Sequence, residues 1–344
     1  MNIQHIKEKL KGFPRVKLMW GPTPIVYAQN ISKDIGINLY IKRDDLSGLA
    51  LGGNKTRKLE FIMGQALKQK YDTVITAGAL HSNHALQTAT AAKKLGMDAV
   101  LVLRGTKENK GNYFMDKIID ADTRVFNVKT SKELKIFMDD IQKELIAEGK
   151  KPLIIPVGGS DPIGALGYIN AALEIIEQCK ELNLDFDYVV TATSSGGTQT
   201  GIMLGCKMLA PSIKMLNIGV GDPREELLSD VYKLAKETRD MLDIQEKIID
   251  EKEMEFATID GYGFGGYGTI VREVIALIRY VAKKEGFYLD PVYTGKAFFG
   301  LMDLVKQKVI PDDSKVLFIH TGGLGGLFQY EDVISEMLNF THTL

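Results

Sequence analysis

The sequence has little of several features that would narrow its class. Its 344 residues include only 2 cysteines, 1 tryptophan and 10 prolines, which excludes a disulfide-stapled scaffold and a proline-rich disordered chain. Lys and Arg number 43 against 44 Asp and Glu, so the formal net charge is −1 and no global field favours phosphate backbones or anionic lipid. We therefore expect no nucleic-acid partner and no membrane association.

Long apolar runs are also lacking. The sequence contains no run of about 18 apolar residues, the length that a membrane-spanning helix requires, and its start lacks the apolar core of a signal peptide. Cys179 and Cys206 lie in segments of helical spacing and form no metal-ligand pattern, so we expect two reduced thiols in the core. Together these features predict a cytoplasmic protein.

What the sequence does contain is an average globular composition, with 45% apolar and 25% charged residues, and a length that suits about two domains. From Asp72 onward, short runs rich in Val, Ile and Leu alternate with longer segments of helical period. This alternation is typical of βαβ units, so we predict an α/β fold with mainly parallel sheets. The expected strands are 73–76, 99–103, 124–128, 153–156, 188–193, 215–220 and 316–320, and the expected helices include 132–148, 163–182, 225–242, 270–285 and 296–309.

Glycine and proline mark the points where strands would pass into helices. In open α/β sheets, ligands bind beyond the carboxyl ends of the strands, which is where such junctions lie. These junctions are therefore where we look for chemistry. They occupy 51–54, 158–162, 194–198, 261–268 and 321–326.

The first junction leads into an amphipathic helix, because Leu59 begins an apolar series at helical spacing. Asn54 is a suitable N-cap, which leaves Lys55 in the first turn, where the helix dipole disfavours a cation. With Arg57 and Lys58 beside it, a lowered amine pKa would make Lys55 a nucleophile toward a carbonyl group. A solvated basic turn is the alternative interpretation.

The junction at 194–198 is rich in small residues and follows an expected strand. Small side chains let backbone N–H groups approach an anion, and the helix that follows adds partial positive charge at its N-terminus. We interpret the segment as a candidate phosphate cradle. It is not a P-loop, because the lysine of that motif is missing. A plain tight turn is the alternative.

Polar side chains follow an expected strand at Ser82, Asn83 and His84, before a helix of small residues. Helix capping is the alternative role for this segment. The pair His81 and His84 lacks the spacing and the glutamate of a zinc site, so no metal is predicted. Two C-terminal junctions, 289–296 and 321–326, also carry hydroxyl groups, with a polar turn as the alternative for each.

Gly261, Gly263 and Gly266 match the spacing of a dinucleotide-binding loop. Such a loop requires a clear strand in front of it, whereas the preceding segment is charged. We interpret this segment instead as a glycine loop that brings Tyr262 or Tyr267 over a ligand.

A lysine at a helix start, a phosphate cradle, a Ser-Asn pair and two hydroxyl-bearing loops are together compatible with a pyridoxal phosphate (PLP) site. The run GGNKTRKLE at 52–60 is especially specific. On these motifs the chain resembles the family of D-cysteine desulfhydrases and 1-aminocyclopropane-1-carboxylate (ACC) deaminases, PLP enzymes of the tryptophan synthase β-subunit fold. The segments that carry the resemblance are 22–24, 41–45, 52–60, 82–84, 111–113, 156–160, 195–198, 289–296 and 320–323.

The resemblance implies how the cofactor would be held. Lys55 would form the Schiff base, and Asn83 would bind the phenolic oxygen of PLP. Thr321 or Thr294 would contact the pyridine nitrogen. The phosphate would be held by four residues of the cradle: Ser195, Gly196, Gly197 and Thr198.

The resemblance also implies the residues around the substrate, which would be a small amino acid. Ser82 would face its carboxylate, and Asn83, His84 and Thr294 are further expected substrate contacts. Tyr267 and Tyr293 would flank substrate and cofactor. The expected catalytic residues are Lys55, Ser82, Tyr267 and Tyr293.

Two positions separate the activities within this family. ACC deaminases carry Glu directly after the tyrosine and Leu in the H-x-G-G motif, whereas this chain has Thr294 and Thr321, as D-cysteine desulfhydrases do. A carboxylate keeps the pyridine nitrogen protonated and makes the ring a strong electron sink, whereas a hydroxyl offers only a neutral hydrogen bond. We therefore expect α,β-elimination, with Lys55 as general base, most readily of D-cysteine to pyruvate, ammonia and hydrogen sulfide.

The alternatives are an ACC deaminase or a cysteate sulfo-lyase of the same fold and, in a different class, a non-catalytic PLP-binding protein. Many desulfhydrases read Q-S-N-H-x-R-Q-T-A, whereas here His81 replaces the glutamine and Leu86 the arginine, and either change could alter substrate choice. The resemblance further implies a small domain, 55–162, inserted into a large PLP-binding domain formed by 1–54 and 163–344, with PLP in the cleft. A homodimer is usual in this fold.

Overall fold

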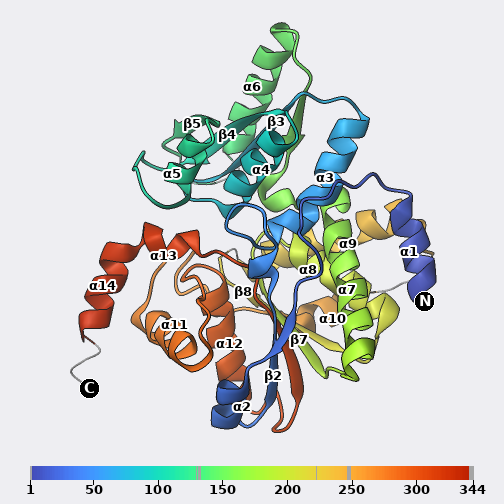
Figure 1. The fold of residues 1–344 in the computed structure, drawn as a ribbon, viewed down its shortest axis with the longest axis vertical. Coiled ribbons are helices and arrows are strands. Elements are labelled where there is room, and N and C mark those ends of the chain that lie inside the picture. The colour runs from blue at the N-terminus through green and yellow to red at the C-terminus, as the bar shows by residue number, and fades with distance from the viewer. Residues whose placement is uncertain (1, 129, 131–132, 222, 246–248, 341–344) are drawn as a thin grey trace.

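Two separate β-sheets organise the chain in the computed structural model, which describes residues 2–128, 130, 133–221, 223–245 and 249–340 (Figure 1). The smaller sheet has the strand order β5-β4-β3-β6 and is parallel throughout. Its strands are β3 (Thr73–Ala79), β4 (Asp98–Arg104), β5 (Asp122–Phe126) and β6 (Pro152–Ile155).

The larger sheet has the order β1-β2-β10-β7-β8-β9, and only β1 runs antiparallel to its neighbour. It joins the two ends of the chain, because Val316 of β10 lies between Leu39 and Tyr188 in the register. The strands are β1 (Ile25–Tyr27), β2 (Asn38–Lys42), β7 (Tyr188–Thr193), β8 (Lys214–Gly219), β9 (Thr258–Ile259) and β10 (Lys315–Ile319).

Helices cover both faces of each sheet, as expected for strands that are buried on both sides. On the smaller sheet, Val74 packs in one cluster with α3 and α4, whereas Ile75 packs in another with α6. On the larger sheet, Val189 packs toward α7 and α8, and Val190 toward α11 and α12. The helices of the smaller sheet are α3 (Lys55–Lys68), α4 (Asn83–Lys94), α5 (Gly111–Ile118) and α6 (Leu134–Ala147).

The remaining helices belong to the larger sheet or to the connections. They are α1 (Ile3–Lys11), α2 (Gln29–Ile35), η1 (Asp44–Leu46), η2 (Val157–Gly159), α7 (Pro162–Leu182), α8 (Gly197–Leu209), α9 (Arg224–Met241), α10 (Glu251–Ala257), α11 (Arg272–Glu285), α12 (Thr294–Lys306), α13 (Gly325–Gln329) and α14 (Glu331–Phe340). Within the described ranges, no helix has both the length and the apolar character that crossing a membrane requires.

The α/β class is confirmed, and each of the seven expected strands is present with ends shifted by a few residues. The sequence interpretation missed β1, β2 and β9, which have three, five and two residues. Lys132, the expected start of one helix, lies outside the described residues, and α6 begins at Leu134. Because all strands of the smaller sheet fall between 73 and 155, we propose the domain division at 55 and 162 on this grouping.

Three parallel strands each end just before a segment that the sequence singled out as a candidate site. β3 leads to Ser82, β7 leads to Ser195, and β10 leads to Thr321. Because the carboxyl ends of parallel strands meet at the same edge of a sheet, β7 and β10 bring their loops together, and the smaller sheet adds the loop after β3.

Candidate active site

A cavity of about 450 Å³ is lined by residues from both sheets. It collects most of the side chains that the sequence singled out. Gly197 and Thr294 are absent from its lining. The expected site residues that line it are Lys55, Ser82, Asn83, His84, Ser195, Gly196, Thr198, Tyr267, Tyr293 and Thr321.

Asn54 connects its own loop before α3 to two other loops at the cavity by hydrogen bonds. Its backbone N–H donates to the carbonyl of Thr321 at 3.0 Å, and its Nδ2 donates to Oγ1 of Thr198 at 2.8 Å. The expectation that the Asn54 side chain caps α3 is wrong, because it makes no capping hydrogen bond. The side chain instead joins the start of α3 to the candidate phosphate cradle.

The two glycines before Asn54 allow this close approach. Gly52 has φ +75, and a Cβ there would lie 1.8 Å from the carbonyl oxygen of Asp45. Gly53 has φ +124, and a Cβ there would lie 2.8 Å from the carbonyl oxygen of Thr321. Any larger residue would therefore clash with backbone, which explains why the turn before Lys55 needs glycine.

Lys55 opens α3 and lies partly buried in the cavity wall. Burial lowers the pKa of its amine to about 8, against an ordinary value of 10.5. The sequence predicted that Arg57 and Lys58 cause such a shift, and this is wrong for both: Arg57 is held in a separate buried ion-pair network, and the hydrogen bond with Lys58 raises the pKa of Lys55 rather than lowering it. A lysine with this pKa is a substantial fraction neutral at physiological pH, as a nucleophile or general base requires.

Lys58 is a functional candidate that the sequence interpretation did not single out. It follows Lys55 by three residues, so the two lie on the same side of α3. The Lys58 amine donates to the carbonyl of Gly158 at 3.0 Å and is buried. Burial, followed by the charge of Lys55, holds its pKa well below the ordinary range. The three-residue spacing was the signal that could have revealed it.

The start of α8 forms an anion-binding cradle. Gly196 has φ +76 and precedes the helix without offering a side-chain cap, so α8 presents backbone N–H groups and the positive end of its dipole. Ser160 reaches this loop, because its Oγ accepts from the N–H of Gly197 at 3.2 Å and donates to Ser195 Oγ at 3.0 Å. The cradle is therefore lined by hydrogen-bonding groups from two chain segments.

A phosphate group fits this cradle. A Cβ on Gly197 would lie 2.8 Å from the amine of Lys58 and 2.7 Å from Ser160 Oγ, so only glycine leaves these groups accessible at the helix start. The buried Lys58 amine, the backbone N–H groups at the helix start and the small side chains together supply the hydrogen-bond donors that a phosphate group requires.

The N-terminus of α4 supplies further donors. Ser82 caps the helix, because its Oγ accepts from the N–H of Ala85 at 3.2 Å, so the capping alternative holds for this residue. Asn83 Oδ1 accepts from Nδ2 of Asn112 at 2.7 Å, which leaves Nδ2 as the donor that Asn83 offers a ligand. Asn112 thus orients Asn83, a role that the sequence motif at 111–113 did not disclose.

His84 lies behind these residues, with its Nε2 at 2.9 Å from Thr76 Oγ1. Burial, followed by the charges of Lys55 and Lys58, holds its pKa well below the ordinary range. The imidazole is therefore neutral at pH 7 and acts as a hydrogen-bonding group rather than as a cation.

Two tyrosines close one side of the cavity. Tyr293 donates its hydroxyl hydrogen to the Tyr267 oxygen at 2.9 Å, and their rings meet edge to face with centroids 5.8 Å apart. Of the two tyrosines considered in the glycine loop, Tyr267 reaches the cavity, whereas Tyr262 donates to Asp303 at 2.8 Å. The strand before this loop, β9, has only two residues, as expected for a loop that does not bind a dinucleotide.

The two threonines that separate the family activities differ in position. Thr321 lines the cavity. Thr294 is fully buried at the start of α12, where its Oγ1 and its backbone N–H both donate to Asp290 Oδ1 at 2.7 Å. Of the two threonines, only Thr321 therefore borders the cavity, and Thr294 stabilises the turn that positions Tyr293.

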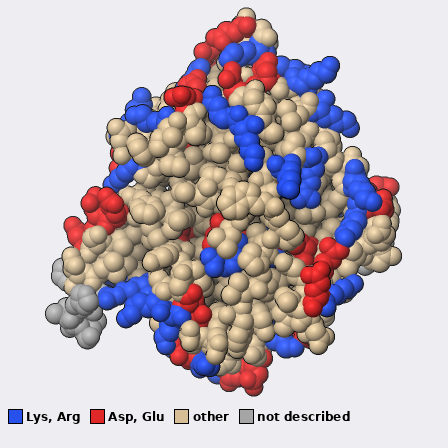
Figure 2. Space-filling view, viewed as in Figure 1, with Lys and Arg blue, Asp and Glu red and all other residues tan. Residues whose placement is uncertain are grey.

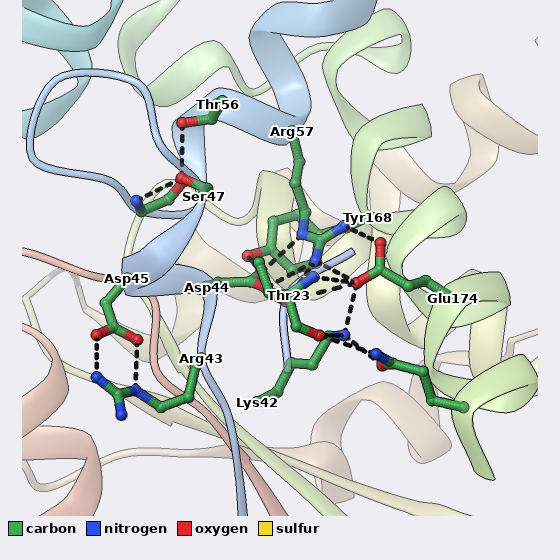
Figure 3. A network of polar contacts seen from close by, with 12 residues as sticks. Thr23, Lys42, Arg43, Asp44, Asp45, Ser47, Thr56, Arg57, Tyr168 and Glu174 are labelled. Carbon is green, nitrogen blue, oxygen red and sulfur yellow. Dashed lines mark hydrogen bonds and ion pairs between the residues drawn. The ribbon is translucent and has the colours of Figure 1, made fainter. Parts of the chain in front are cut away.

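A buried charge network anchors the helix that carries Lys55 (Figure 3). Arg57 bonds Asp44 on one side and Glu174 of α7 on the other, at 2.7 to 2.9 Å. Burial alone would raise the pKa of Asp44, but the charge and hydrogen bonds of Arg57 lower it to about 2. Lys42 bonds the same glutamate at 2.5 Å. The first turn of α3 is thus held by charges from three elements.

Charges on the surface follow no single sign. Figure 2 shows Lys and Arg side chains interspersed with Asp and Glu around the rim of the face drawn. This distribution matches the near-zero net charge of the sequence.

The fold and the site together define a PLP enzyme, and the comparisons with known proteins agree. The family model described as "Pyridoxal-phosphate dependent enzyme" matches residues 16–322, and the chain belongs to this family. Its cofactor is therefore PLP, as predicted from the motifs, and the protein is an enzyme.

Relatives over nearly the full length carry two activity names. A Pyrococcus furiosus protein, whose name provisionally describes it as a 1-aminocyclopropane-1-carboxylate deaminase, is 48% identical over 97% of this chain and 99% of its own. A D-cysteine desulfhydrase of Klebsiella pneumoniae is 39% identical over 94% of this chain and 98% of its own. A crystal structure titled as an ACC deaminase homologue superposes with a TM-score of 0.91, at 48% identity over 97% and 99% of the two chains. The predicted family is confirmed.

Proposed function

We propose that this enzyme catalyses α,β-elimination of a β-substituted amino acid, with D-cysteine as the preferred substrate and pyruvate, ammonia and hydrogen sulfide as products. The observation that carries the proposal is that neutral Thr321 lines the cavity, together with the hydrogen bonds of Thr294 to Asp290. No carboxylate occupies either of the two positions that distinguish the activities.

Bound PLP supplies an electron sink for negative charge at the substrate Cα. Lys55 is the residue that would hold the cofactor and then take the Cα proton, because burial places its pKa near the working pH. Lys58, Ser195, Thr198 and the N–H groups at the start of α8 would hold the phosphate.

Asn83 Nδ2 would donate to the phenolic oxygen, because Asn112 already occupies Oδ1. Thr321 would offer its hydroxyl to the pyridine nitrogen. These contacts orient the ring without placing a full charge beside that nitrogen, so the stabilisation of a carbanion stays modest. A modest electron sink suits the loss of a good leaving group from Cβ.

The N-terminus of α4 would bind the substrate carboxylate through Ser82, with Asn83 and neutral His84 beside it. Tyr267 and Tyr293 would flank the substrate on the opposite side and exclude water. Sulfide leaves with the bonding electrons and takes up a proton, and the enamine that remains hydrolyses to pyruvate and ammonia.

ACC deamination is the second candidate, favoured by the names of the relatives at 48% identity. Opening the cyclopropane ring proceeds without a leaving group and needs a stronger electron sink than a threonine hydroxyl provides. Cysteate is the third candidate, because His81 and Leu86 depart from the common desulfhydrase motif.

Pyruvate release from D-cysteine, L-cysteine, cysteate and ACC tests the proposal. D-cysteine is expected to be the best substrate and ACC the poorest. ACC as the best wild-type substrate would overturn the proposal, and cysteate as the best would keep the reaction type but replace sulfide with sulfite.

We further propose a cytoplasmic homodimer, on the resemblance to this family. Both cysteines are free and buried, as predicted, and burial raises the pKa of Cys179 to about 11 and that of Cys206 to about 12. Unreactive core thiols suit a reducing compartment. Size-exclusion chromatography with light scattering would give a mass near twice 38.1 kDa if the dimer forms.

A further inference from the structure

The glycine loop, residues 261–268, carries Tyr267 to the cavity. It lies between β9 and α11 and contains neither helix nor strand. A Cβ at Gly261, Gly265 or Gly266 would meet no atom within 4 Å, so close packing does not hold these positions. The position of Tyr267 therefore depends on specific contacts to the loop. Five residues of the loop have positive φ: Gly261, Phe264, Gly265, Gly266 and Gly268.

Lys296 of α12 makes two of these contacts. Its amine donates to the carbonyl oxygen of Gly263 at 2.8 Å and to that of Gly266 at 3.1 Å. The same Gly263 oxygen accepts from the backbone N–H of Gly266 at 3.1 Å, which closes a turn in the loop. The lysine thus holds both ends of this turn.

The second of these carbonyls belongs to the residue directly before Tyr267. A peptide group is planar, so the Gly266 oxygen and the N–H of Tyr267 keep a fixed relation. Binding this oxygen therefore also fixes the peptide plane from which Tyr267 extends. Gly266 has φ +142, and a glycine backbone can adopt many other conformations. The contact with Lys296 therefore favours one of them.

Lys296 is completely buried, although it does not line the cavity. Within the described part of the chain, both hydrogen bonds that it donates go to the loop carbonyls, and the ring of Phe264 lies 6.0 Å from its amine. Burial lowers the pKa of this amine to about 8 and the charge of Asp290 opposes the shift, so the amine is mainly protonated at pH 7. A buried ammonium group costs free energy that an apolar side chain would not. The amine therefore contributes through the loop groups that it binds.

The start of α12 thus contacts both tyrosines of the cavity wall. Tyr293 comes three residues before Lys296 and lines the cavity itself. Its hydroxyl donates to the Tyr267 oxygen at 2.9 Å. One end of this helix therefore fixes the tyrosine pair, Tyr267 and Tyr293: Tyr293 binds the hydroxyl of Tyr267, and Lys296 binds the backbone that leads to it.

We propose that Lys296 is a positioning residue of this enzyme, whose amine holds the glycine loop so that Tyr267 lies against the substrate. The inference rests on the proposed function in one respect, the place of Tyr267 beside the substrate. It does not depend on which amino acid is cleaved. Because Lys296 does not line the cavity, its effect on the reaction has to pass through Tyr267.

Lys296→Met tests the proposal, because methionine has a similar length and donates no hydrogen bond. For the amino acid that the wild type cleaves fastest, we expect kcat/KM to fall at least tenfold. PLP content and the absorption spectrum of the bound cofactor should stay at the wild-type level, since Lys55 and the cradle lie on α3 and α8. Lys296→Arg, which keeps the charge and N–H donors, should retain more activity. Lys306→Met, at an exposed position of α12, is the matched control and should leave kcat/KM unchanged.

A double-mutant cycle separates positioning from general stability. Tyr267→Ala should lower kcat/KM at least tenfold by itself. Adding Lys296→Met to it should cost less than a further twofold, because the residue through which Lys296 acts is already gone. Losses that multiply would mean that Lys296 does not act through Tyr267 and would overturn the proposal.

Hydrogen exchange reports on the loop directly and needs no substrate. In the PLP-loaded Lys296→Met variant, peptides covering 261–268 should exchange at least fivefold faster than in the wild type at short labelling times, while peptides covering α3 and α8 keep their rates. Unchanged exchange in the loop would overturn the proposal, and so would equal acceleration in all three segments, which would indicate a loss of global stability. Lys296→Gln, whose side chain is shorter and uncharged, replaces Lys296→Met if that variant does not fold, with the same expectations.

This inference and the proposed function fail in different experiments. A best substrate other than D-cysteine would count against the proposed function, and the cycle with that substrate would still decide the role of Lys296. Independent effects of Lys296→Met and Tyr267→Ala, in an enzyme that cleaves D-cysteine, would overturn this inference alone.

Discussion

Arg57 donates two hydrogen bonds to Asp44, from Nε to Oδ2 at 2.8 Å and from Nη2 to Oδ1 at 2.7 Å, and both side chains are buried. Arg57 follows Lys55 by only two residues, so the pair fixes the first turn of α3 against η1, while Lys55 lies in the cavity wall. The position of the reactive amine therefore depends on a charge pair that does not itself line the cavity.

Replacing one member of this pair should destabilise the fold strongly. Asp44→Asn removes one anion from the buried network, and Arg57→Met removes one cation. Either change leaves a buried charge without its counter-charge, which costs about 3–5 kcal/mol of the free energy of unfolding. Urea denaturation of each variant should show a large shift of the midpoint. The surface pair Arg124 and Glu144 is the control, because Arg124→Met should cost less than about 1 kcal/mol. Equal shifts at the two sites would contradict the assignment.

Lys55 should be the only lysine that carries the cofactor. Borohydride reduction followed by peptide mapping is expected to place the pyridoxyl group on Lys55, because its amine is desolvated, has a pKa of about 8 and lines the cavity. Lys58→Met should still be labelled at Lys55, although with weaker cofactor binding. Label at Lys58 in the wild-type protein would show that Lys58, and not Lys55, forms the Schiff base.

Cofactor incorporation should depend on pH through Lys55. Only the neutral amine attacks a carbonyl, and burial lowers the pKa from 10.5 to about 8, so the neutral fraction rises with pH and levels off above pH 8. Stopped-flow mixing of apoprotein with PLP should give a rate that rises to a plateau in this range. An N-acetyl-lysine amide serves as the reference, and its rate should continue to rise toward pH 10.5. Coincident profiles would mean that the Lys55 amine is not desolvated.

Changes in the cradle and changes at the tyrosine pair should have separate effects. Ser195→Ala or Thr198→Ala should weaken PLP retention about 10- to 150-fold, the equivalent of roughly 1.5–3 kcal/mol for a hydrogen bond to a charged group. Thr198→Ala also removes the acceptor for Asn54 Nδ2. Tyr293→Phe should mainly lower kcat, because this residue lies at the substrate side. Equilibrium dialysis of PLP and steady-state kinetics distinguish the two effects, and similar cofactor loss in all three variants would remove the distinction.

The sequence predicted local features well where a single segment carries the signal. Short apolar runs that alternate with segments of helical period indicated the seven strands, and the motif at 52–60 singled out Lys55. It missed β2, whose five residues become a strand by pairing with β10 more than 270 positions later. The three-residue edge strand β1 pairs with β2, so it could not be recognised once β2 was missed.

The sequence by itself determined the α/β class, the family and the set of polar residues that could serve a PLP site, because periodicity, glycine turns and motifs are properties of neighbouring residues. Only the tertiary structure decided which of them face the cavity. Arg57 and Lys58 are adjacent in sequence, yet one joins a buried ion-pair network and the other lies beneath the phosphate cradle. Thr321 reaches the cavity, whereas Thr294 is held by Asp290. Desolvation, hydrogen-bond partners and the contact of Lys296 with the glycine loop all arise from packing between distant segments, and for that reason they are set by the fold rather than by local sequence.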